Sequence, residues 1–439
     1  MENFFPEILI TYLLWFRQAF FKSGFVFFEG FICCQLLAGG RKTITRIASL
    51  CFFIDKSLSA WERFLSTAQW DLTQVVGRLI ELVLSQMGQS LLFASHYVFA
   101  VDTTLAVKQM GKMTGVQRWS QGKPDTESRV SLTGHNWAIG GFIAFITNRW
   151  LCFPILTRLI SGHQRRWAFA VNCAGEAKPV SVLETVLAMV RVVAEKITKA
   201  PLCVVADAYF AKAVFFNGLA RLGISVVTRL RWDAVGFDDP HYCGRGRPPV
   251  RGKKWKLAHL CDRFPTQSVM VELYGRTRSI TYVMREVWLR DVQKRIKVVV
   301  IKTQGRPIIL ASSAPGLTAG EIIAIYGGRF SLELAIRDLK QHFGFCHYQA
   351  TTTLAFLRFT QLCCCAATIG RLILLKKDSS LPLADVLRST DFVTELSFSR
   401  LRQSIRRFVL RRLLFSKSAA DANLQKVKNP LEAIVRLMG

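Results

Sequence analysis

A change in the spacing of apolar residues between positions 96 and 231 constrains the fold more than any other feature. Four apolar segments rich in β-branched and aromatic residues come first and predict strands. A helix, a strand, a second helix and a further strand follow. The expected strands are His96–Thr104, Asn136–Thr147, Arg149–Thr157, Arg165–Asn172, Pro201–Ala208 and Gly223–Arg231, and the expected helices are Val180–Ile197 and Lys212–Leu222. This order predicts an α/β domain with a mixed sheet.

The flanking segments divide the chain into five expected parts. Residues 1–94 and 346–439 have mostly helical patterns, and the last apolar segment of the chain is rich in arginine. A β-rich insertion is expected at 233–304, because strand patterns follow an irregular, basic loop with many Pro and Gly residues. The α/β domain is therefore expected in two pieces, 95–232 and 305–345. In the second piece, Thr318 and Glu321 have the spacing of a capping box that begins a helix.

The charge balance limits the classes of partner. The chain has 59 Lys and Arg residues against 30 Asp and Glu, a net charge of +29. This excess favours a polyanionic partner, either nucleic acid or an anionic membrane surface. The most apolar stretches, Phe4–Phe16, Ser23–Gly40 and Val130–Asn148, are too short or too polar for a bilayer span of about 20 residues. We therefore expect no transmembrane segment, and the sequence start lacks the basic region of a secretory signal.

The cysteines do not predict a metal site. The chain has 12 Cys residues but no C-x-x-C pair, so a zinc site is not indicated. Several cysteines lie in apolar runs, including the pair at 33–34 and the triplet at 363–365. We expect buried free thiols in a reducing cytoplasm.

The stretch Ile325–Gly344 predicts a helix with a polar stripe. The polar residues, at spacings of three, four and seven, are Tyr326, Arg329, Glu333 and Lys340. In a helix they lie within about 60° of one another, beside an apolar stripe that can pack on a core. Two interpretations stay open from this stretch alone. The stripe is either a solvated face, in which Arg329, Glu333 and Arg337 form i,i+4 ion pairs, or a face turned toward a cleft.

Three carboxylates stand out by their position. Asp102 and Asp207 come near the ends of predicted strands, and Glu333 lies on the helix after the last strand. Ligand sites of α/β sheets form outside the carboxyl ends of strands. Three converging carboxylates repel one another unless cations hold them, and oxygen ligands of this kind suit Mg²⁺ or Mn²⁺. For each residue alone, a turn-capping Asp or a solvent-facing Glu is an equally good interpretation.

These motifs resemble those of a known family. The pattern Tyr326-x2-Arg329-x3-Glu333-x6-Lys340 resembles, spacing for spacing, the Y-R-E-K signature of bacterial insertion-sequence transposases of the DDE class. The similarity extends to FAVDTTLAVKQMGKM around Asp102, to VVADAYFAKAVF near position 207 and to the β-rich insertion. It covers roughly residues 95–345, and the N-terminal segments ITRIAS and WERFLSTAQWD carry a weaker similarity.

The resemblance implies a fold, an activity and site residues. It implies a ribonuclease-H-like core in which Asp102, Asp207 and Glu333 hold two Mg²⁺ or Mn²⁺ ions. Enzymes of this family cut the ends of a mobile element by hydrolysis and join the freed 3′-OH to target DNA by transesterification. Tyr326, Arg329 and Lys340 match signature positions that contact DNA near the scissile bond. This role suits their chemistry, since Arg forks onto phosphate oxygens and Lys supplies a point charge.

Other basic residues are weaker candidates for DNA contacts. They are Arg337, Lys108, Lys112, and Arg245 and Arg247 of an RGRPP sequence. The RGRPP segment suits an A·T-rich minor groove, but a basic loop that follows phosphates explains it as well. Arg337 could instead pair with Glu333, and the two lysines could be solvated surface residues. The lone His135 precedes a strand, where a structural role is the more common one.

Together these features predict a metal-dependent DNA transposase with a ribonuclease-H-like α/β core, a helical end-binding region (1–94) and a basic helical tail (346–439). The expected partners are double-stranded DNA, as terminal inverted repeats and as target, and a second copy of the chain in a synaptic dimer. The expected location is the bacterial cytoplasm, at the nucleoid. The alternative is a DNA-binding protein or repressor that kept the fold and lost catalysis.

Overall fold

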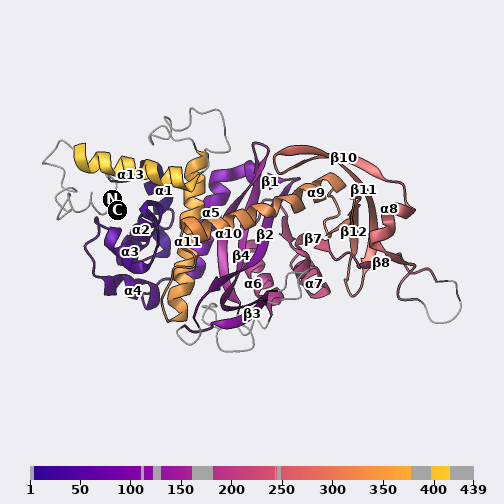
Figure 1. Ribbon diagram of the computed structural model, residues 1–439, viewed down its shortest axis with the longest axis horizontal. Coiled ribbons are helices and arrows are strands. Elements are labelled where there is room, and N and C mark those ends of the chain that lie inside the picture. The colour runs from indigo at the N-terminus through magenta and orange to yellow at the C-terminus, as the bar shows by residue number, and fades with distance from the viewer. Residues whose placement is uncertain are drawn as a thin grey trace.

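A large mixed sheet organises the molecule (Figure 1). The computed structural model describes residues 4–109, 113–121, 130–160, 181–242, 244, 249–376 and 397–415. In this part of the chain, one sheet of 13 strands runs in the order β3-β4-β2-β6-β7-β13-β12-β11-β8-β9, and β1, β5 and β10 pair at its sides. Helices from both ends of the chain gather at one end of the molecule, and the β-rich insertion lies at the other (Figure 1).

The core of the sheet matches the predicted α/β region. Its strands are β2 (His96–Val107), β4 (Val130–Ile146), β5 (Arg149–Ile160), β6 (Leu202–Ala206) and β7 (Ser225–Leu230). β4 is antiparallel to β5 and β2, whereas β6 is parallel to β2 and β7. The helices of the core are α6 (Val182–Ala194) and α7 (Ala213–Arg221). The predicted ribonuclease-H-like mixed α/β fold is confirmed; the strand expected at Arg165–Asn172 lies outside the described residues.

The β-rich insertion continues the core sheet. Its elements are β8 (Val235–Phe237), β9 (Lys254–Lys256), α8 (Leu260–Arg263), β10 (Gln267–Leu273), β11 (Arg276–Leu289) and β12 (Arg295–Ile301). The strand after it, β13 (Ile308–Ser312), pairs antiparallel with both β7 and β12. Main-chain hydrogen bonds therefore join the insertion to the core. Two short strands that the pattern does not predict are β1 (Leu92–Phe93) and β3 (Gln117–Gln121), which pair with β2 and β4.

Two helices, rather than the predicted single one, cover Ile325–Gly344. They are α9 (Ala319–Gly328) and α10 (Phe330–His342). α9 begins with the capping box predicted at Thr318 and Glu321. It ends at Gly328, which lies against the indole of Trp150, where an added Cβ would come within 2.5 Å of the ring. Glycine weakens a helix, and the helix is interrupted at this point. The prediction of one continuous helix was therefore wrong, and Arg329 lies between the two helices.

The helices at the two ends of the chain form one layer. They are α1 (Glu7–Leu14), α2 (Lys22–Leu37), α3 (Ile44–Leu50), α4 (Leu58–Ser66), α5 (Leu72–Met87), α11 (Thr353–Leu375) and α13 (Phe398–Phe415). Short 3-10 helices cover Arg17–Ala19, Gly88–Leu91, Ala208–Phe210 and Leu257–His259. Phe31 of α2 and Phe359 of α11 meet edge to face at 5.4 Å between ring centroids. The described parts of the regions 1–94 and 346–439 thus pack together in one hydrophobic core.

The centre of this layer is α11, which packs on both β5 and the N-terminal helices. It is the one helix among the described residues that is long and apolar enough to cross a membrane, and 94% of the relevant window is buried inside the protein. Cys363, Cys364 and Cys365 are fully buried within it as free thiols. The helix thus has the surroundings of a protein core, as its apolar sequence requires.

Candidate active site

Parallel pairing of β2 and β6 brings two aspartates to the same edge of the sheet. The paired register ends with Ala100 opposite Val205; Asp102 comes two residues later within β2, and Asp207 comes two residues later, directly after β6. A separation of two residues keeps a side chain on the same face of a strand. The prediction that Asp102 ends its strand was wrong, because β2 continues to Val107 along β4, with Asp102 opposite Ile139.

Asp207 is fixed by the turn that follows β6. Its carboxylate accepts a hydrogen bond from the Tyr209 backbone N–H at 3.0 Å and caps the 3-10 helix Ala208–Phe210. Its backbone carbonyl accepts a hydrogen bond from the hydroxyl of Thr228 at 2.8 Å. Thr228 is fully buried on β7, so the adjacent parallel strand holds Asp207 in position.

Glu333 reaches the same edge from α10, which lies across the core strands (Figure 1). Arg329 connects it to the sheet: its guanidinium lies 3.0 Å from Asp102 Oδ2 and 2.6 Å from Glu333 Oε1. Because both guanidinium nitrogens belong to one small planar group, these two carboxylate oxygens lie within about 8 Å of each other. The i,i+4 pair expected of a solvated helix is present, but it faces Asp102 rather than open water.

The apolar stripe beside Glu333 holds α10 against the sheet. Leu332 and Leu339 are fully buried, and Ile336 is nearly so. As a result the Arg329 side chain is only 14% exposed and that of Asp102 18%, whereas Glu333 keeps 40% of its side chain in solvent. A substrate can therefore approach the site from the side of Glu333.

Burial and the Arg329 guanidinium act in opposite directions on the pKa values of the two aspartates. Burial raises the pKa of Asp102 to about 6, repulsion from Asp207 and Glu333 adds to this, and the Thr103 N–H and Arg329 oppose it. The pKa of Asp207 is also raised, by burial first and by Glu333, against the pull of Arg329. For Arg329, burial disfavours the charged form, but Asp102 and Glu333 outweigh it and the pKa rises. Arg329 thus pairs with Asp102 and Glu333, and its charge also opposes the rise in the pKa of Asp207.

The donor set fits a hard divalent cation. Three carboxylates supply the oxygen ligands that Mg²⁺ and Mn²⁺ prefer, and a cation between Asp102 and Asp207 would offset the burial and repulsion that raise the pKa of both. Among the described residues, no three Asp, Glu, His or Cys side chains form a closed metal-binding set. The Arg329 guanidinium lies between Asp102 and Glu333, in ion-pair contact with both.

The other predicted site residues fall in three groups. Tyr326 lies beside the cluster, its ring centroid 5.9 Å from the Arg329 guanidinium. Lys340 and Lys108 are bonded to backbone carbonyls: Lys340 to Leu105 at 3.1 Å, and Lys108 to Cys346 and Tyr348 at 2.7 Å each. These bonds tie α10 and the turn after it to the end of β2. Lys112, Arg245 and Arg247 lie outside the described residues, and Arg337 lines a separate pocket.

His135 has the structural role that is usual for a lone histidine. Its side chain is fully buried between the Thr114 carbonyl, at 2.8 Å, and the Tyr348 hydroxyl, at 2.9 Å. Burial lowers its pKa to about 4, so the ring is neutral at pH 7. No sequence pattern indicated Tyr348 or Thr228, because their hydrogen bonds to His135 and Asp207 join segments that are far apart in the chain.

Comparison with known proteins supports the interpretation of the fold. A family model described as DDE superfamily endonuclease matches residues 26–281, more than half of the chain. The match includes Asp102 and Asp207 and ends within β11, before Glu333. No curated protein matches the chain significantly. The chain belongs to the DDE superfamily of endonucleases.

Proposed function

We propose that this endonuclease is a DNA transposase of the insertion-sequence group with the Y-R-E-K signature. The observation that carries the proposal is the ion-pair bridge from Asp102 through Arg329 to Glu333. It connects a helix beyond the family match to an aspartate within it, across 227 residues of sequence between Asp102 and Arg329. A third carboxylate at this edge is the feature that a DDE active site requires.

The signature residues are arranged in support of this proposal. Arg329 and Glu333 contact each other, and Tyr326 lies next to Arg329. Lys340 lies further along the same side of α10 and bonds to the main chain of β2. We propose that Tyr326, Arg329 and Lys340 contact DNA next to the scissile bond, with Arg329 moving from the carboxylates to a phosphate oxygen. A guanidinium suits both partners because it pairs in the same forked geometry with carboxylate and phosphate.

Asp102, Asp207 and Glu333 are the proposed catalytic and metal-binding residues. Two Mg²⁺ or Mn²⁺ ions bound by them would activate the attacking hydroxyl and stabilise the leaving oxygen. In the first reaction, water attacks phosphorus at the element end and the P–O3′ bond breaks, which leaves a 3′-OH and a 5′-phosphate. In the second, that 3′-OH attacks a phosphorus of the target, forms a new phosphodiester and releases a target 3′-OH.

We further propose that the N-terminal helices, residues 1–94, bind the terminal inverted repeats, and that two copies of the chain synapse two ends. The β-rich insertion and the C-terminal helical region would complete the DNA interface, including Lys112, Arg245 and Arg247. A basic chain of this kind would act in the bacterial cytoplasm, on the nucleoid. Lys108 is a weak candidate for a DNA contact, because its ammonium group already donates hydrogen bonds to two backbone carbonyls.

A cleavage assay tests the proposal. The purified chain is incubated with duplexes that carry the DNA flanking its gene, with Mg²⁺ or with a chelator. We expect cleavage at the element 3′ ends, and joining of those ends to a supercoiled plasmid, only in the presence of the metal. DNA binding without cleavage under any metal condition would instead support the alternative, a DNA-binding protein that lost catalysis.

A further inference from the structure

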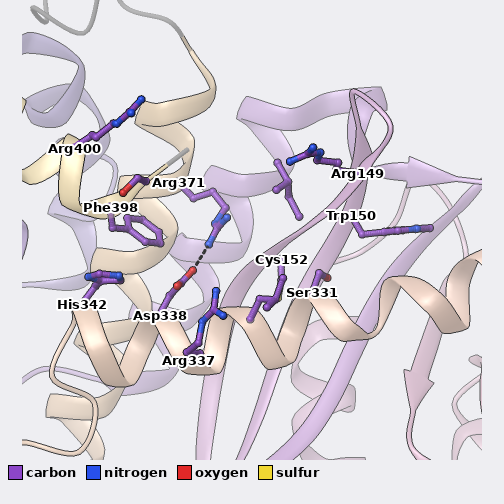
Figure 2. A pocket seen from close by; sticks show the side chains of 13 residues that line it. Arg149, Trp150, Cys152, Ser331, Arg337, Asp338, His342, Arg371, Phe398 and Arg400 are labelled. Carbon is purple, nitrogen blue, oxygen red and sulfur yellow. Dashed lines mark hydrogen bonds and ion pairs between the residues drawn. The ribbon is translucent and has the colours of Figure 1, made fainter. Parts of the chain in front are cut away.

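A second, strongly basic pocket lies on another side of α10 (Figure 2). It has a volume of about 620 Å³ and is enclosed by α10, the start of β5, the end of α11 and the start of α13. Its charged residues come from all four elements and are Arg149, Arg337, Asp338, His342, Arg371 and Arg400. Four arginines thus face a single carboxylate, so the pocket favours an anion.

The pocket is separate from the catalytic carboxylates, although both use α10. Asp338 follows Glu333 by five residues, which corresponds to about 140° around the helix and about 7 Å along it. The side of Glu333 faces Asp102, whereas Asp338 faces Arg371 on α11 at 2.9 Å (Figure 2). A ligand in the pocket would therefore lie near the active site without touching it.

The walls of the pocket contain buried polar groups without partners. Within the described part of the chain, Arg371 Nε, Arg400 Nη1 and Ser331 Oγ are buried and make no hydrogen bond. Ser331 is 5% exposed and Arg371 8%. The Arg371 guanidinium is also held in place, 4.9 Å from the ring of Phe398 and paired with Asp338. Unpaired buried donors are rare and costly, so their convergence indicates a ligand with acceptor oxygens.

We propose that this pocket binds a backbone phosphate of DNA, together with its sugar, as a second anchor for the strand that is cut. This inference rests on the proposed function, because it assumes that DNA is the substrate. A pocket of this volume is larger than a lone phosphate needs and suits a nucleotide unit. The arginines would hold the phosphate through forked hydrogen bonds, and the hydroxyl of Ser331 would donate to a phosphate oxygen.

The surface next to the pocket supports a strand rather than a free phosphate. A second cavity of about 380 Å³ shares Arg149, Trp150, Ser331 and Leu334 with the first. Its rim carries two aromatic residues in edge contact, Tyr274, 67% exposed, and Phe330, 41% exposed. Arginines beside exposed aromatic rings form the type of groove on which bases stack while the phosphates are held.

The test compares the salt dependence of DNA binding between the wild type and the double variant Arg149→Gln/Arg400→Gln. Neither Arg149 nor Arg400 forms an ion pair with a described residue. The double substitution therefore removes no ion pair from the described part of the folded chain. We expect binding to a duplex to weaken about tenfold, and the slope of log K against log salt to decrease in magnitude by about 1. Arg221→Gln, at an exposed arginine that ends α7 and does not line the pocket, is the matched control and should change neither.

A competition experiment with inorganic phosphate distinguishes a pocket that binds a DNA phosphate from one that binds a free anion. If the pocket takes a DNA phosphate, millimolar phosphate should compete with DNA for the wild type more strongly than for the double variant. If phosphate protects only the wild type against heat while DNA binding is the same in both, the pocket is a free-anion site and the proposal is wrong. An unchanged slope in the double variant, or an equal loss in Arg221→Gln, would also overturn it.

Glu333→Gln separates this inference from the proposed function. That variant should lose cleavage and keep the wild-type salt slope, because Glu333 lies outside the pocket. If the wild type binds and cleaves DNA but the double variant keeps its slope, only the pocket assignment fails. If the wild type does not bind DNA at all, both proposals fail.

Discussion

Replacing Glu333 with glutamine is expected to reduce DNA cleavage by at least about 10³-fold while leaving DNA affinity within a few-fold of the wild type. Glutamine keeps the size of the side chain and its packing on α10, but removes the negative charge that would hold a cation. It also removes one of the two ion pairs of Arg329. Single-turnover cleavage at saturating DNA measures the chemical step, and a binding titration with the chelated protein measures affinity.

The matched control is Glu195→Gln. Glu195 follows α6 and forms an exposed i,i+4 pair with Arg191, in which both side chains are more than 60% exposed. Its replacement removes one carboxylate far from the cluster and should leave cleavage unchanged. Cleavage by Glu333→Gln at near the wild-type rate would exclude Glu333 from the catalytic set, even if the fold and the DNA binding are as proposed.

Replacing Arg358 with alanine is expected to destabilise the protein by about 3 kcal/mol or more. Arg358 lies on α11, is 4% exposed, and donates hydrogen bonds to the end of α4 and to the connection between α4 and α5. Its guanidinium donates to four carbonyls, those of Phe64 (3.5 Å), Leu65 (3.2 Å), Ala68 (2.9 Å) and Trp70 (2.5 Å). Truncation leaves these acceptors without the charged donor and opens a cavity beside the Trp70 ring, 4.2 Å from the guanidinium.

Urea unfolding of the variant should show a midpoint well below that of the wild type. Arg358→Lys keeps the charge but not the five-donor fork, so it should lie between the two. Arg63→Ala, at an exposed position on α4, should stay within about 0.5 kcal/mol of the wild type. An Arg358→Ala midpoint equal to that of Arg63→Ala would contradict a role for this residue in joining the two terminal regions.

Local patterns predicted the sheet core and the candidate carboxylates. The apolar run before Asp207 forms a strand that is buried along its whole length, and the capping box at Thr318 begins a helix as expected. These features depend on a few neighbouring residues, so the sequence contains them. The sequence also shows the order of Asp102, Asp207 and Glu333 along the chain. In the structure, the parallel register of β2 and β6 places the two aspartates at one edge of the sheet.

Long-range packing accounts for what the sequence did not predict. The helix break at Arg329 depends on Gly328 meeting Trp150, a residue from β5. The joint core of the terminal regions depends on contacts such as those of Arg358 with the α4–α5 connection, across 288 residues in the case of Trp70. Lys108 was a candidate for a DNA contact, with a solvated surface residue as the alternative, but its ammonium group donates to carbonyls of the turn after α10. None of these partners has a sequence spacing that a local pattern could detect.

The central claim is that Asp102, Asp207 and Glu333 form one cation site, which Arg329 now bridges. Diffraction from crystals soaked in Mn²⁺, measured at the manganese edge, tests this claim most directly. We predict anomalous density between the three carboxylates, and we expect the Arg329 guanidinium to be displaced from Asp102 and Glu333. It would be contradicted if Arg329 keeps both ion pairs while Mn²⁺ binds elsewhere or not at all.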